Sequence, residues 1–493
     1  MGKQKIVLIS FVSLLIISLF AVQNVNAPNT IYIRANGSVE GTSNIVTSDS
    51  ITYTFTDNIQ GEIKVERDNI ILDGNGYSLN GAGAATGIEV KNRNNVTIKR
   101  VEVTTFQNGI GLWYSQSITI SDSEIRDCHP NQGIYCYSTT NSLITGNTIE
   151  NNTGNGIHLS SSSNGFIITQ NSIINNNEGV YLLGGSSSSI ISKNSITENR
   201  GNGILDSGIG NNTISENTVT NNGAYGIRLG SSSNNIITHN TITHSNSVGI
   251  GLWDSSSNNK ITENSVTNNK IGVYMYTSNN NYNNITLNTI NNNIEDGISC
   301  SYESDFSSII GNTIKSNGKY GIQLAYSDET KITENNVADN GKYGIRLFDS
   351  SDSIIHHNTF DNTQQVIVEG SDSQSNSWDN GTEGNYWSDY LTKYPSAKEA
   401  GDSGVWDAPY VIDDNNSDKY PLMGGATPIP TPNPTPTPTP SPTPSGTSTP
   451  DPEPQQTSKF PIETVIAAIL AIVAVVAILA FLRLKKRQAQ KTS

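Results

Sequence analysis

The sequence predicts an all-β solenoid, a parallel β-helix of about 13 coils, because one short unit recurs along most of its 493 residues. Within each unit the apolar residues alternate with polar ones, which is the strand period and puts the apolar side chains on one face. A single unit cannot bury that face, whereas stacked units bury it together. The unit opens with Gly-Ile/Val-x-apolar and repeats every 22 to 25 residues, at Gly87, Gly109, Gly133, Gly156, Gly179, Gly203, Gly226, Gly249, Gly272, Gly297, Gly321 and Gly344.

The composition argues against other classes of protein. The chain holds 63 Asn and 43 Gly, which are poor helix formers, so an α-helical body is excluded. Three Cys cannot staple a chain of this length into a disulfide scaffold. A formal charge of −15 has the wrong sign for a nucleic-acid partner. The Leu-x-x-Leu-x-Leu signature of a leucine-rich horseshoe is missing, and a propeller would need longer units.

A column of Asn residues keeps step with the Gly motif. Asn tolerates left-handed backbone and its amide bonds the groups that a tight bend exposes, so we expect a structural ladder. Cys136 and Cys300 fall on inward positions seven coils apart and are expected to fill the core. The ladder members are Asn147, Asn171, Asn194, Asn217, Asn240, Asn264, Asn288, Asn312, Asn335 and Asn358.

The N-terminal part and the body divide into four segments. Residues 1–27 predict a secretory signal peptide, with Lys3 and Lys5 before an apolar run. An N-terminal membrane anchor is the alternative interpretation. We expect residues 28–62 to form an N-terminal cap, residues 63–370 the repeats and residues 371–424 a C-terminal cap over the last coil.

The C-terminal segments predict a membrane anchor. Residues 425–459 are a Thr/Pro-rich stalk that favours polyproline II. Residues 460–483 contain an uncharged apolar run long enough to cross the hydrocarbon core as a helix, although a buried core helix is the alternative. The basic tail 484–493 follows and is expected to stay cytoplasmic. We therefore expect a single-pass protein of the cell membrane with an extracellular body.

Seven Asn-x-Ser/Thr sequons mark candidate glycosylation sites. Most sequons in so Asn-rich a chain arise by chance, so they carry little weight alone, but they agree with an extracellular glycoprotein. The sequons begin at Asn36, Asn95, Asn151, Asn211, Asn284, Asn380 and Asn415.

Two segments at the ends of the repeats resemble a known class. The run Ile-Ile-Leu-Asp-Gly-Asn-Gly at 70–76 looks like its entry motif, and Gly-Asn-Tyr-Trp-Ser-Asp-Tyr at 384–390 looks like its exit. With 409–413 and 420–422, they make the chain resemble the right-handed parallel β-helix proteins of the pectin-lyase-like class. It is most similar to the NosD-like (periplasmic copper-binding) and carbohydrate-binding β-helix families of archaeal and bacterial surfaces. The resemblance covers about residues 50–423 and implies a fold more strongly than a function.

The sequence nominates no catalytic pair. The Asn-Thr-Asp, Gly-His-Gly and Arg-Ile-Lys motifs of related pectin hydrolases are missing, as is the Arg-x-Pro-x-x-Arg of pectate lyases. Hydrolysis or elimination needs a proton donor or acceptor beside a group that stabilises developing charge. We therefore assign no catalytic residue and expect a protein that is not an enzyme.

Two sets of residues are candidate metal ligands. Glu216, His239 and Glu263 precede the ladder Asn in successive coils, where they either bind a metal or form a solvated charge column with Lys193. Asp414, Asn416 and Asp418 alternate as in calcium loops, although Lys419 replaces the loop Gly. Copper, which the NosD resemblance implies, is disfavoured because the six His are scattered and Met is scarce.

Aromatic residues are the most suggestive candidates for binding. They fall on outward positions of the Gly-Ile strands in two clusters, whereas Tyr181 and Phe348 stand more alone. Exposed rings on a flat strand face suit stacking against sugars, although rings that brace one another are the alternative. The candidate carbohydrate-binding residues are Trp113, Tyr114, Tyr135, Tyr137, Trp253, Tyr274 and Tyr276.

We therefore expect a cell-surface β-helix that binds polysaccharide or another envelope partner without catalysis. It needs no cofactor on this interpretation, with calcium as the exception to test. The alternatives are a polysaccharide lyase or hydrolase of the pectin-lyase-like fold, a copper-accessory protein, and a purely structural envelope protein.

Overall fold

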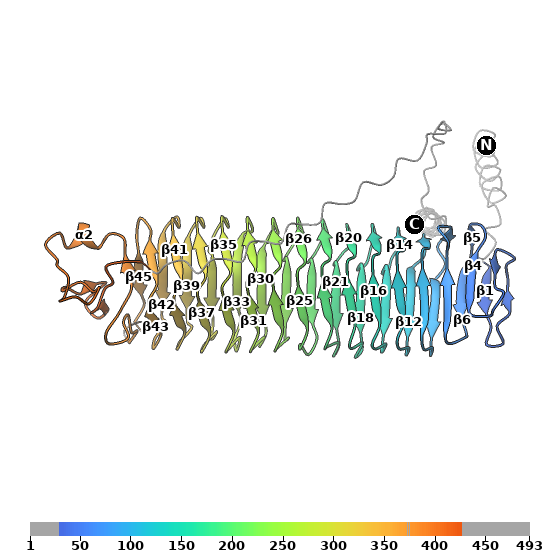
Figure 1. Cartoon of the computed structure of the whole chain (residues 1–493), viewed down its shortest axis with the longest axis horizontal. Coiled ribbons are helices and arrows are strands. Elements are labelled where there is room, and N and C mark those ends of the chain that lie inside the picture. Colours follow the sequence, from blue (N-terminus) through green and yellow to red (C-terminus); the bar gives the residue numbers. More distant parts are fainter. Residues whose placement is uncertain (1–28, 372, 374, 426–493) are drawn as a thin grey trace, which may run out of the picture. The chain divides into compact units, whose positions relative to one another are not determined.

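The repeated motifs fold into three parallel sheets that run along one stack of coils, as the computed structural model describes for residues 29–371, 373 and 375–425 (Figure 1). Each coil contributes one short strand to each sheet, and polar turns join them. The predicted signal peptide, membrane helix and basic tail lie outside the described residues, as does the stalk after its first residue. Within the described residues, no helix has the length and apolar character needed to cross a bilayer.

Sheet A carries the Gly-Ile motifs. Its sixteen strands, in chain order, are β1 (Thr30–Ile33), β2 (Val39–Glu40), β6 (Glu62–Val65), β9 (Thr86–Lys91), β12 (Asn108–Trp113), β15 (Ile134–Tyr137), β18 (Ile157–Ser160), β21 (Val180–Leu183), β24 (Ile204–Ser207), β27 (Ile227–Gly230), β30 (Val248–Trp253), β33 (Ile271–Tyr276), β36 (Ile298–Ser301), β39 (Tyr320–Ala325), β42 (Tyr343–Phe348) and β45 (Val366–Glu369).

Sheet B follows sheet A in each coil. Its fifteen strands are β3 (Ile45–Val46), β4 (Thr52–Phe55), β7 (Ile70–Asp73), β10 (Val96–Lys99), β13 (Thr119–Ser121), β16 (Leu143–Thr145), β19 (Ile167–Thr169), β22 (Ile190–Ser192), β25 (Thr213–Ser215), β28 (Ile236–Thr238), β31 (Lys260–Thr262), β34 (Asn284–Thr286), β37 (Ser308–Ile310), β40 (Lys331–Thr333) and β43 (Ile354–His356).

Sheet C closes each coil. Its fifteen strands are β5 (Ile59–Gln60), β8 (Ser78–Asn80), β11 (Glu102–Thr104), β14 (Glu124–Arg126), β17 (Thr148–Glu150), β20 (Ser172–Ile174), β23 (Ser195–Thr197), β26 (Thr218–Thr220), β29 (Thr241–Thr243), β32 (Ser265–Thr267), β35 (Thr289–Asn291), β38 (Thr313–Lys315), β41 (Asn336–Ala338), β44 (Thr359–Asp361) and β46 (Tyr386–Trp387).

The solenoid has about 15 turns, so the expected 13 coils were too few. Coils without the full Gly-Ile motif lie at both ends: β1 and β6 keep the period-two alternation before Gly87, and β45 follows β42 at the other end. β1 already pairs in parallel with β6, and β6 pairs with β9. Counting the Gly motif alone therefore undercounts the stack.

The core is a set of apolar columns inside the three sheets. In β27, Ile227 and Leu229 are fully buried whereas Arg228 points outward, and the same alternation recurs along sheet A. Cys136 and Cys300 occupy such inward positions, as expected, and their thiols are free. The third described cysteine, Cys128, is also buried and free.

Long Asn ladders line two of the three bends in each coil. The expected ladder lies between sheets B and C, where Nδ2 of Asn240 donates to Oδ1 of Asn264 over 2.9 Å. A second ladder, which was not predicted, lies between sheets C and A, where Nδ2 of Asn152 donates to Oδ1 of Asn176 over 2.9 Å. These buried amides also bond backbone carbonyls, so the bends keep few unpaired polar groups.

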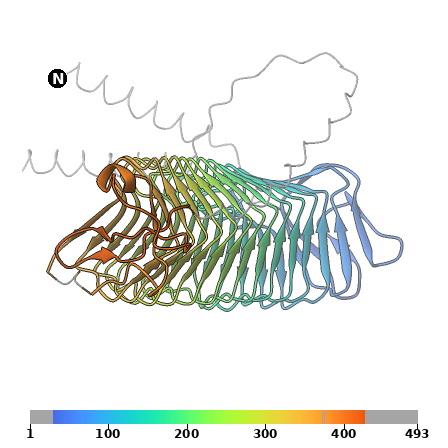
Figure 2. The ribbon, with the colours of Figure 1, turned by 60° about the vertical axis from the view of Figure 1, so that its left-hand side comes forward.

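The C-terminal segment packs over the last coil (Figure 2). Here α2 (Tyr390–Lys393) and the antiparallel pair β47 (Tyr410–Val411) and β48 (Ser417–Asp418) follow β46. Trp387 is buried, with its ring centroid 4.9 Å from that of Phe360 in the coil and 4.3 Å from that of Tyr410. These stacked rings cover apolar side chains that the solenoid would otherwise expose.

Candidate functional site

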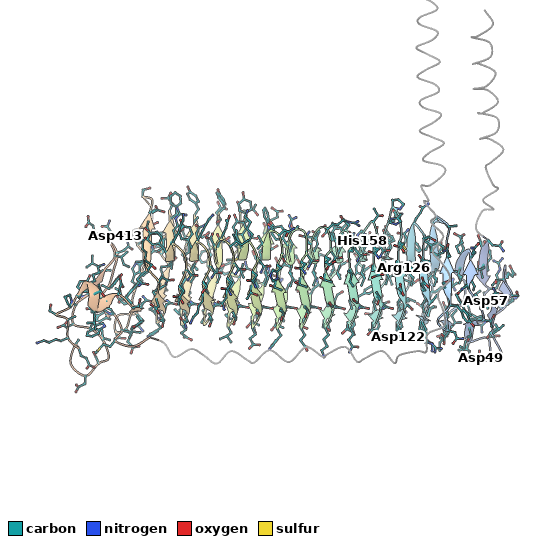
Figure 3. All side chains as sticks on the ribbon, turned by 90° about the horizontal axis from the view of Figure 1, so that it is seen from above. Asp49, Asp57, Asp122, Arg126, His158 and Asp413 are labelled. Atoms are coloured by element: carbon teal, nitrogen blue, oxygen red, sulfur yellow. The ribbon has the colours of Figure 1, made fainter. Side chains whose placement is uncertain are left out.

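The outer face of sheet A holds the predicted aromatic residues. Two columns of side chains point outward from its strands, one after the inward Ile or Val and one after the inward Leu (Figure 3, where His158 of the first column is labelled). Because the strands pair in register, residues of one column are neighbours from coil to coil. The register of the strands therefore determines which outward side chains are neighbours.

The first platform, which we define as Trp113, Tyr114, Tyr135 and Tyr137, is a cluster of rings that contact one another in pairs. The ring centroids of Trp113 and Tyr135 lie 6.0 Å apart, and those of Tyr114 and Tyr137 lie 5.4 Å apart, both edge to face. Tyr114 is 54% exposed, whereas the other three are half-buried. The rings thus brace one another and still reach solvent.

His158 continues the first platform into the next coil. Its ring stands edge-on to Tyr135 at 5.4 Å and stacks on Tyr181 at 4.9 Å, so Tyr181 is not isolated as the sequence suggested. Nε2 of Gln132 lies 3.2 Å from Nδ1 of His158, while the buried Nε2 of His158 has no hydrogen-bond partner among the described residues. Burial lowers the pKa of His158 to about 4, so the imidazole is neutral at neutral pH.

The second platform, which we define as Trp253, Tyr274 and Tyr276, is also a cluster of rings in mutual contact. The ring centroid of Trp253 lies 6.3 Å from that of Tyr274 and 4.5 Å from that of Tyr276. All three residues are half-buried. Burial raises the pKa of Tyr274 to about 12, so its hydroxyl stays protonated and can donate a hydrogen bond.

The second platform belongs to a longer row of rings. Tyr225 precedes it by one coil, and Tyr302, Tyr326 and Phe348 follow it, each in contact with the next at 5.2 to 6.1 Å. Tyr302 and Tyr326 are 50% and 44% exposed and stack with an interplanar angle of 18°. We call this row the aromatic track, and it consists of Tyr225, Trp253, Tyr274, Tyr276, Tyr302, Tyr326 and Phe348.

A glycine lies under each tryptophan. A Cβ atom at Gly111 would come within 2.1 Å of the Trp113 ring. At Gly251 it would come within 2.7 Å of the Tyr225 ring and 3.3 Å of Nε1 of Trp253. Any side chain at these outward positions would push the rings away, so both glycines make room for rings that lie across the strand.

Arg228 supplies a positive charge beside the second platform. Its guanidinium carbon lies 5.5 Å from the Tyr225 ring centroid and 5.1 Å from that of Trp253. Its buried Nε has no hydrogen-bond partner within the described part of the chain. Burial raises the pKa of Glu178, while the positive charge of Arg228 opposes that rise. The guanidinium of Arg228 is thus held against the rings, where its charge can attract the oxygens of an acidic ligand.

The first set of predicted metal ligands forms contacts within the protein. Nε2 of His239 lies 2.7 Å from Oε2 of Glu263, and Nζ of Lys193 lies 3.8 Å from Oε2 of Glu216. No group of three or more His, Cys, Asp or Glu side chains is placed to hold a metal ion in residues 29–371, 373 and 375–425. A metal at this column stays a prediction that the arrangement does not support.

The second set lies in the C-terminal segment, next to Asp413 (labelled in Figure 3). Asn416 accepts a hydrogen bond from Nε1 of Trp378 and donates to Asp413. Asp418 accepts from Nε1 of Trp387 at 2.9 Å, and burial raises its pKa to about 6. The oxygens of Asn416 and Asp418 thus hold the cap together, and calcium at Asp414, Asn416 and Asp418 stays a prediction.

Sequence reasoning missed several residues of this face. His158, Tyr225 and Arg228 lie in coils between or beside the platforms, and their roles depend on neighbours from adjacent coils. A signal for Tyr302 and Tyr326 was present, because they are 24 residues apart, which is one coil. Both have positive φ, 55° and 53°, at the turn after sheet A, where the strand pattern does not apply.

Comparison with solved structures finds matches over about two thirds of the chain. Among solved structures, the periplasmic alginate epimerase AlgG matches over 68% of this chain and 78% of its own at 15% identity, with a TM-score of 0.35. The A-module of the Azotobacter vinelandii mannuronan C-5 epimerase AlgE4 matches over 64% and 90% at 12% identity, with a TM-score of 0.35. A tailspike protein of E. coli bacteriophage HK620 in complex with a pentasaccharide matches over 64% and 71% at 10% identity, with a TM-score of 0.41.

The family assignment rests on the sequence. Comparison with curated proteins gives no match. The family model described as the right handed beta helix region matches residues 22–173, 67–219, 187–337 and 283–388, which together span most of the stack. The chain therefore belongs to the right-handed β-helix family.

Proposed function

We propose that the outer face of sheet A binds a polysaccharide that lies along the axis of the stack. The observation that carries this proposal is the aromatic track, whose seven rings follow one another through six consecutive coils from Tyr225 to Phe348. At about 4.8 Å between strands, this row is about 24 Å long. A linear row of rings matches an extended polymer better than a small compact ligand.

The chemistry of the face suits sugars. Partly exposed aromatic rings offer flat apolar surfaces to the C–H groups of a sugar, and such clusters tend to mark binding sites. The guanidinium of Arg228 lies against Tyr225 and Trp253, and its positive charge can attract carboxylate oxygens of an acidic sugar. The overall charge of −15 disfavours nucleic acid as the polymer.

Affinity electrophoresis of the full chain tests the proposal. Gels containing β-1,4-glucan, xylan, mannan or polygalacturonate are compared, and at least one polymer should retard the protein. Tyr326→Ala should weaken that retardation. Tyr282→Ala is the matched control, because Tyr282 is 56% exposed against 44% for Tyr326 and also has positive φ but stacks on Phe306, just before β34 of sheet B. No retardation by any polymer, or equal retardation of both variants and the parent, would refute the site.

We also propose that this body is displayed on the cell surface. The stalk, the apolar run within residues 460–483 and the basic tail support this as sequence features. Membrane fractionation of the chain with and without residues 460–493 tests it. Equal release of both forms into the soluble fraction would contradict the anchor.

Catalysis on the bound polymer is a second candidate, and it rests on His158. Its neutral imidazole, held between Tyr135 and Tyr181, has a buried Nε2 without a partner among described side chains. Because the amide nitrogen of Gln132 donates to Nδ1, Nε2 carries the proton of the imidazole and can donate a hydrogen bond to a sugar oxygen that gains negative charge. New reducing ends or unsaturated sugars, lost in His158→Gln, would support this candidate, and their absence from every polymer that binds would exclude it.

A further inference from the structure

One five-residue motif occurs twice on the outer face of sheet A. Gly-Ile-Gly-Leu-Trp forms residues 109–113 and again residues 249–253. In the next coil each copy meets an apolar-Tyr-x-Tyr segment, Ile134–Tyr137 or Val273–Tyr276. The Gly-Ile scaffold requires neither the second glycine nor the tryptophan, because the other coils carry different residues at both outward positions.

The two copies build similar local geometry. Trp113 contacts Tyr135 at 6.0 Å and 65°, and Trp253 contacts Tyr274 at 6.3 Å and 82°. In both copies the outward glycine leaves room for a ring over the strand. Trp253 also contacts Tyr276 at 4.5 Å, whereas Tyr137 in the first platform contacts Tyr114. The first and second platforms are therefore similar surfaces built on the same motif.

The platforms face the same way at a fixed distance. β12 and β30 belong to sheet A and are six strand steps apart in its order (Figure 1). At about 4.8 Å for each step, their separation is about 29 Å. The parallel register keeps Trp113 and Trp253 in the same outward column.

The outward column between the platforms carries short side chains. It holds Ser160, Leu183, Ser207 and Gly230, all half-buried, in β18, β21, β24 and β27. The side chains of the neighbouring outward column, His158, Tyr181, Leu205 and Arg228, are mostly longer. A polymer chain can therefore run from one platform to the other over the short column.

We propose that the two platforms are paired subsites for one polysaccharide chain, so that binding strength depends on chain length. This inference rests on the proposed function. An extended sugar chain advances about one sugar for each strand spacing, so about six sugars separate the platforms and about eight or more cover both. A sugar chain that reaches both platforms binds more tightly, because contact with the first platform gives it a high effective concentration at the second.

Calorimetry on the unmodified full chain tests this without any variant. The ligand is a sized fraction of whichever polymer retards the protein in the gels above. A tetrasaccharide should bind with two equivalents for each chain, whereas a dodecasaccharide should bind with one equivalent and about 10²-fold more tightly.

Variants then separate the platforms. Trp113→Ala and Trp253→Ala should each lower the stoichiometry of the tetrasaccharide from two to one and reduce dodecasaccharide affinity to nearly that of the tetrasaccharide. Gly111→Ala, which displaces the Trp113 ring but keeps it in the chain, should act as Trp113→Ala does. Unchanged circular dichroism of each variant shows that the solenoid is intact.

The outcomes distinguish the two proposals. A protein that no polymer retards refutes the proposed function and this inference with it. Retardation together with equal affinity for both fractions, or one equivalent of tetrasaccharide on the unmodified chain, overturns the paired subsites and leaves the proposed function standing.

Discussion

The Asn ladder gives the most direct test of how the coils hold together. Asn240 is 1% exposed and lies at the bend between β28 and β29. Its Nδ2 donates to the carbonyls of Ile214 and Thr238 and to Oδ1 of Asn264, at 2.9 to 3.1 Å. Its Oδ1 accepts from the backbone and side-chain nitrogens of Asn217, both at 3.0 Å. Asn240→Ala removes all five contacts.

The magnitude follows from these contacts. An amide has two donor hydrogens and two acceptor lone pairs, so four bonds count fully, and at about 1 kcal/mol each their loss costs about 4 kcal/mol. The substitution also leaves the buried backbone N–H of Asn217 without an acceptor among the described residues, and this unpaired group adds to the loss of stability. Asn240 has no positive φ, so alanine adds no backbone strain.

Guanidinium unfolding of the full chain, followed by circular dichroism, measures the effect. Asn246→Ala is the matched control, because Asn246 is exposed and its side chain has no hydrogen-bond partner in the described coils. We expect Asn240→Ala to unfold at clearly lower guanidinium, with faster hydrogen exchange in the coils around residues 214–264. Equal midpoints for the two variants would show that the ladder does not stabilise the stack.

Three further predictions concern the cap, the thiols and the rings. Burial raises the pKa of Asp418 from its ordinary 3.8 to about 6. The protonated carboxyl therefore stabilises the folded state below about pH 4, and the free energy of unfolding should fall by about 3 kcal/mol as the pH rises from 4 through 6. Asp418→Asn should unfold with a shallower pH slope between 4 and 6, and an unchanged slope would contradict the assignment. The three cysteines should not react with a thiol reagent until guanidinium unfolds the chain, because burial raises the thiol pKa, to about 12 for Cys128. Gly251→Ala should alter tryptophan fluorescence and weaken polymer retardation, whereas Gly424→Ala, whose Cβ would meet no atom within 4 Å in the C-terminal segment, should do neither.

The interior of the fold was largely predictable because it depends on alternation alone. Ile227 and Leu229 had to face inward once the strand period was recognised, and stacking then placed Trp113 beside Tyr135. The number of coils was underestimated where the Gly motif is missing, although the alternation continues there.

The candidate site was only partly predictable because its missing members depend on turns and on neighbouring coils. The second ladder repeats five residues after the first, as Asn152 follows Asn147, so its signal was present in the spacing. The low pKa of His158 instead depends on burial between Tyr135 and Tyr181, which belong to different coils. No local pattern contains that information.

Inner and outer positions of the strands differ in how much they contribute to stability, and this difference explains where a functional site can lie. Inside, apolar columns and amide ladders satisfy almost every group, so substitution there is costly and changes little except stability. Outside, a side chain contributes little to folding, and a glycine in a strand even weakens it. The rings that lie over Gly111 and Gly251 are therefore the reason for a glycine at these two positions. The Gly-Ile-Gly-Leu-Trp motif occurs twice on the outer face, at a spacing that one extended polymer can bridge. Binding of a ligand explains this repetition better than the needs of the solenoid do.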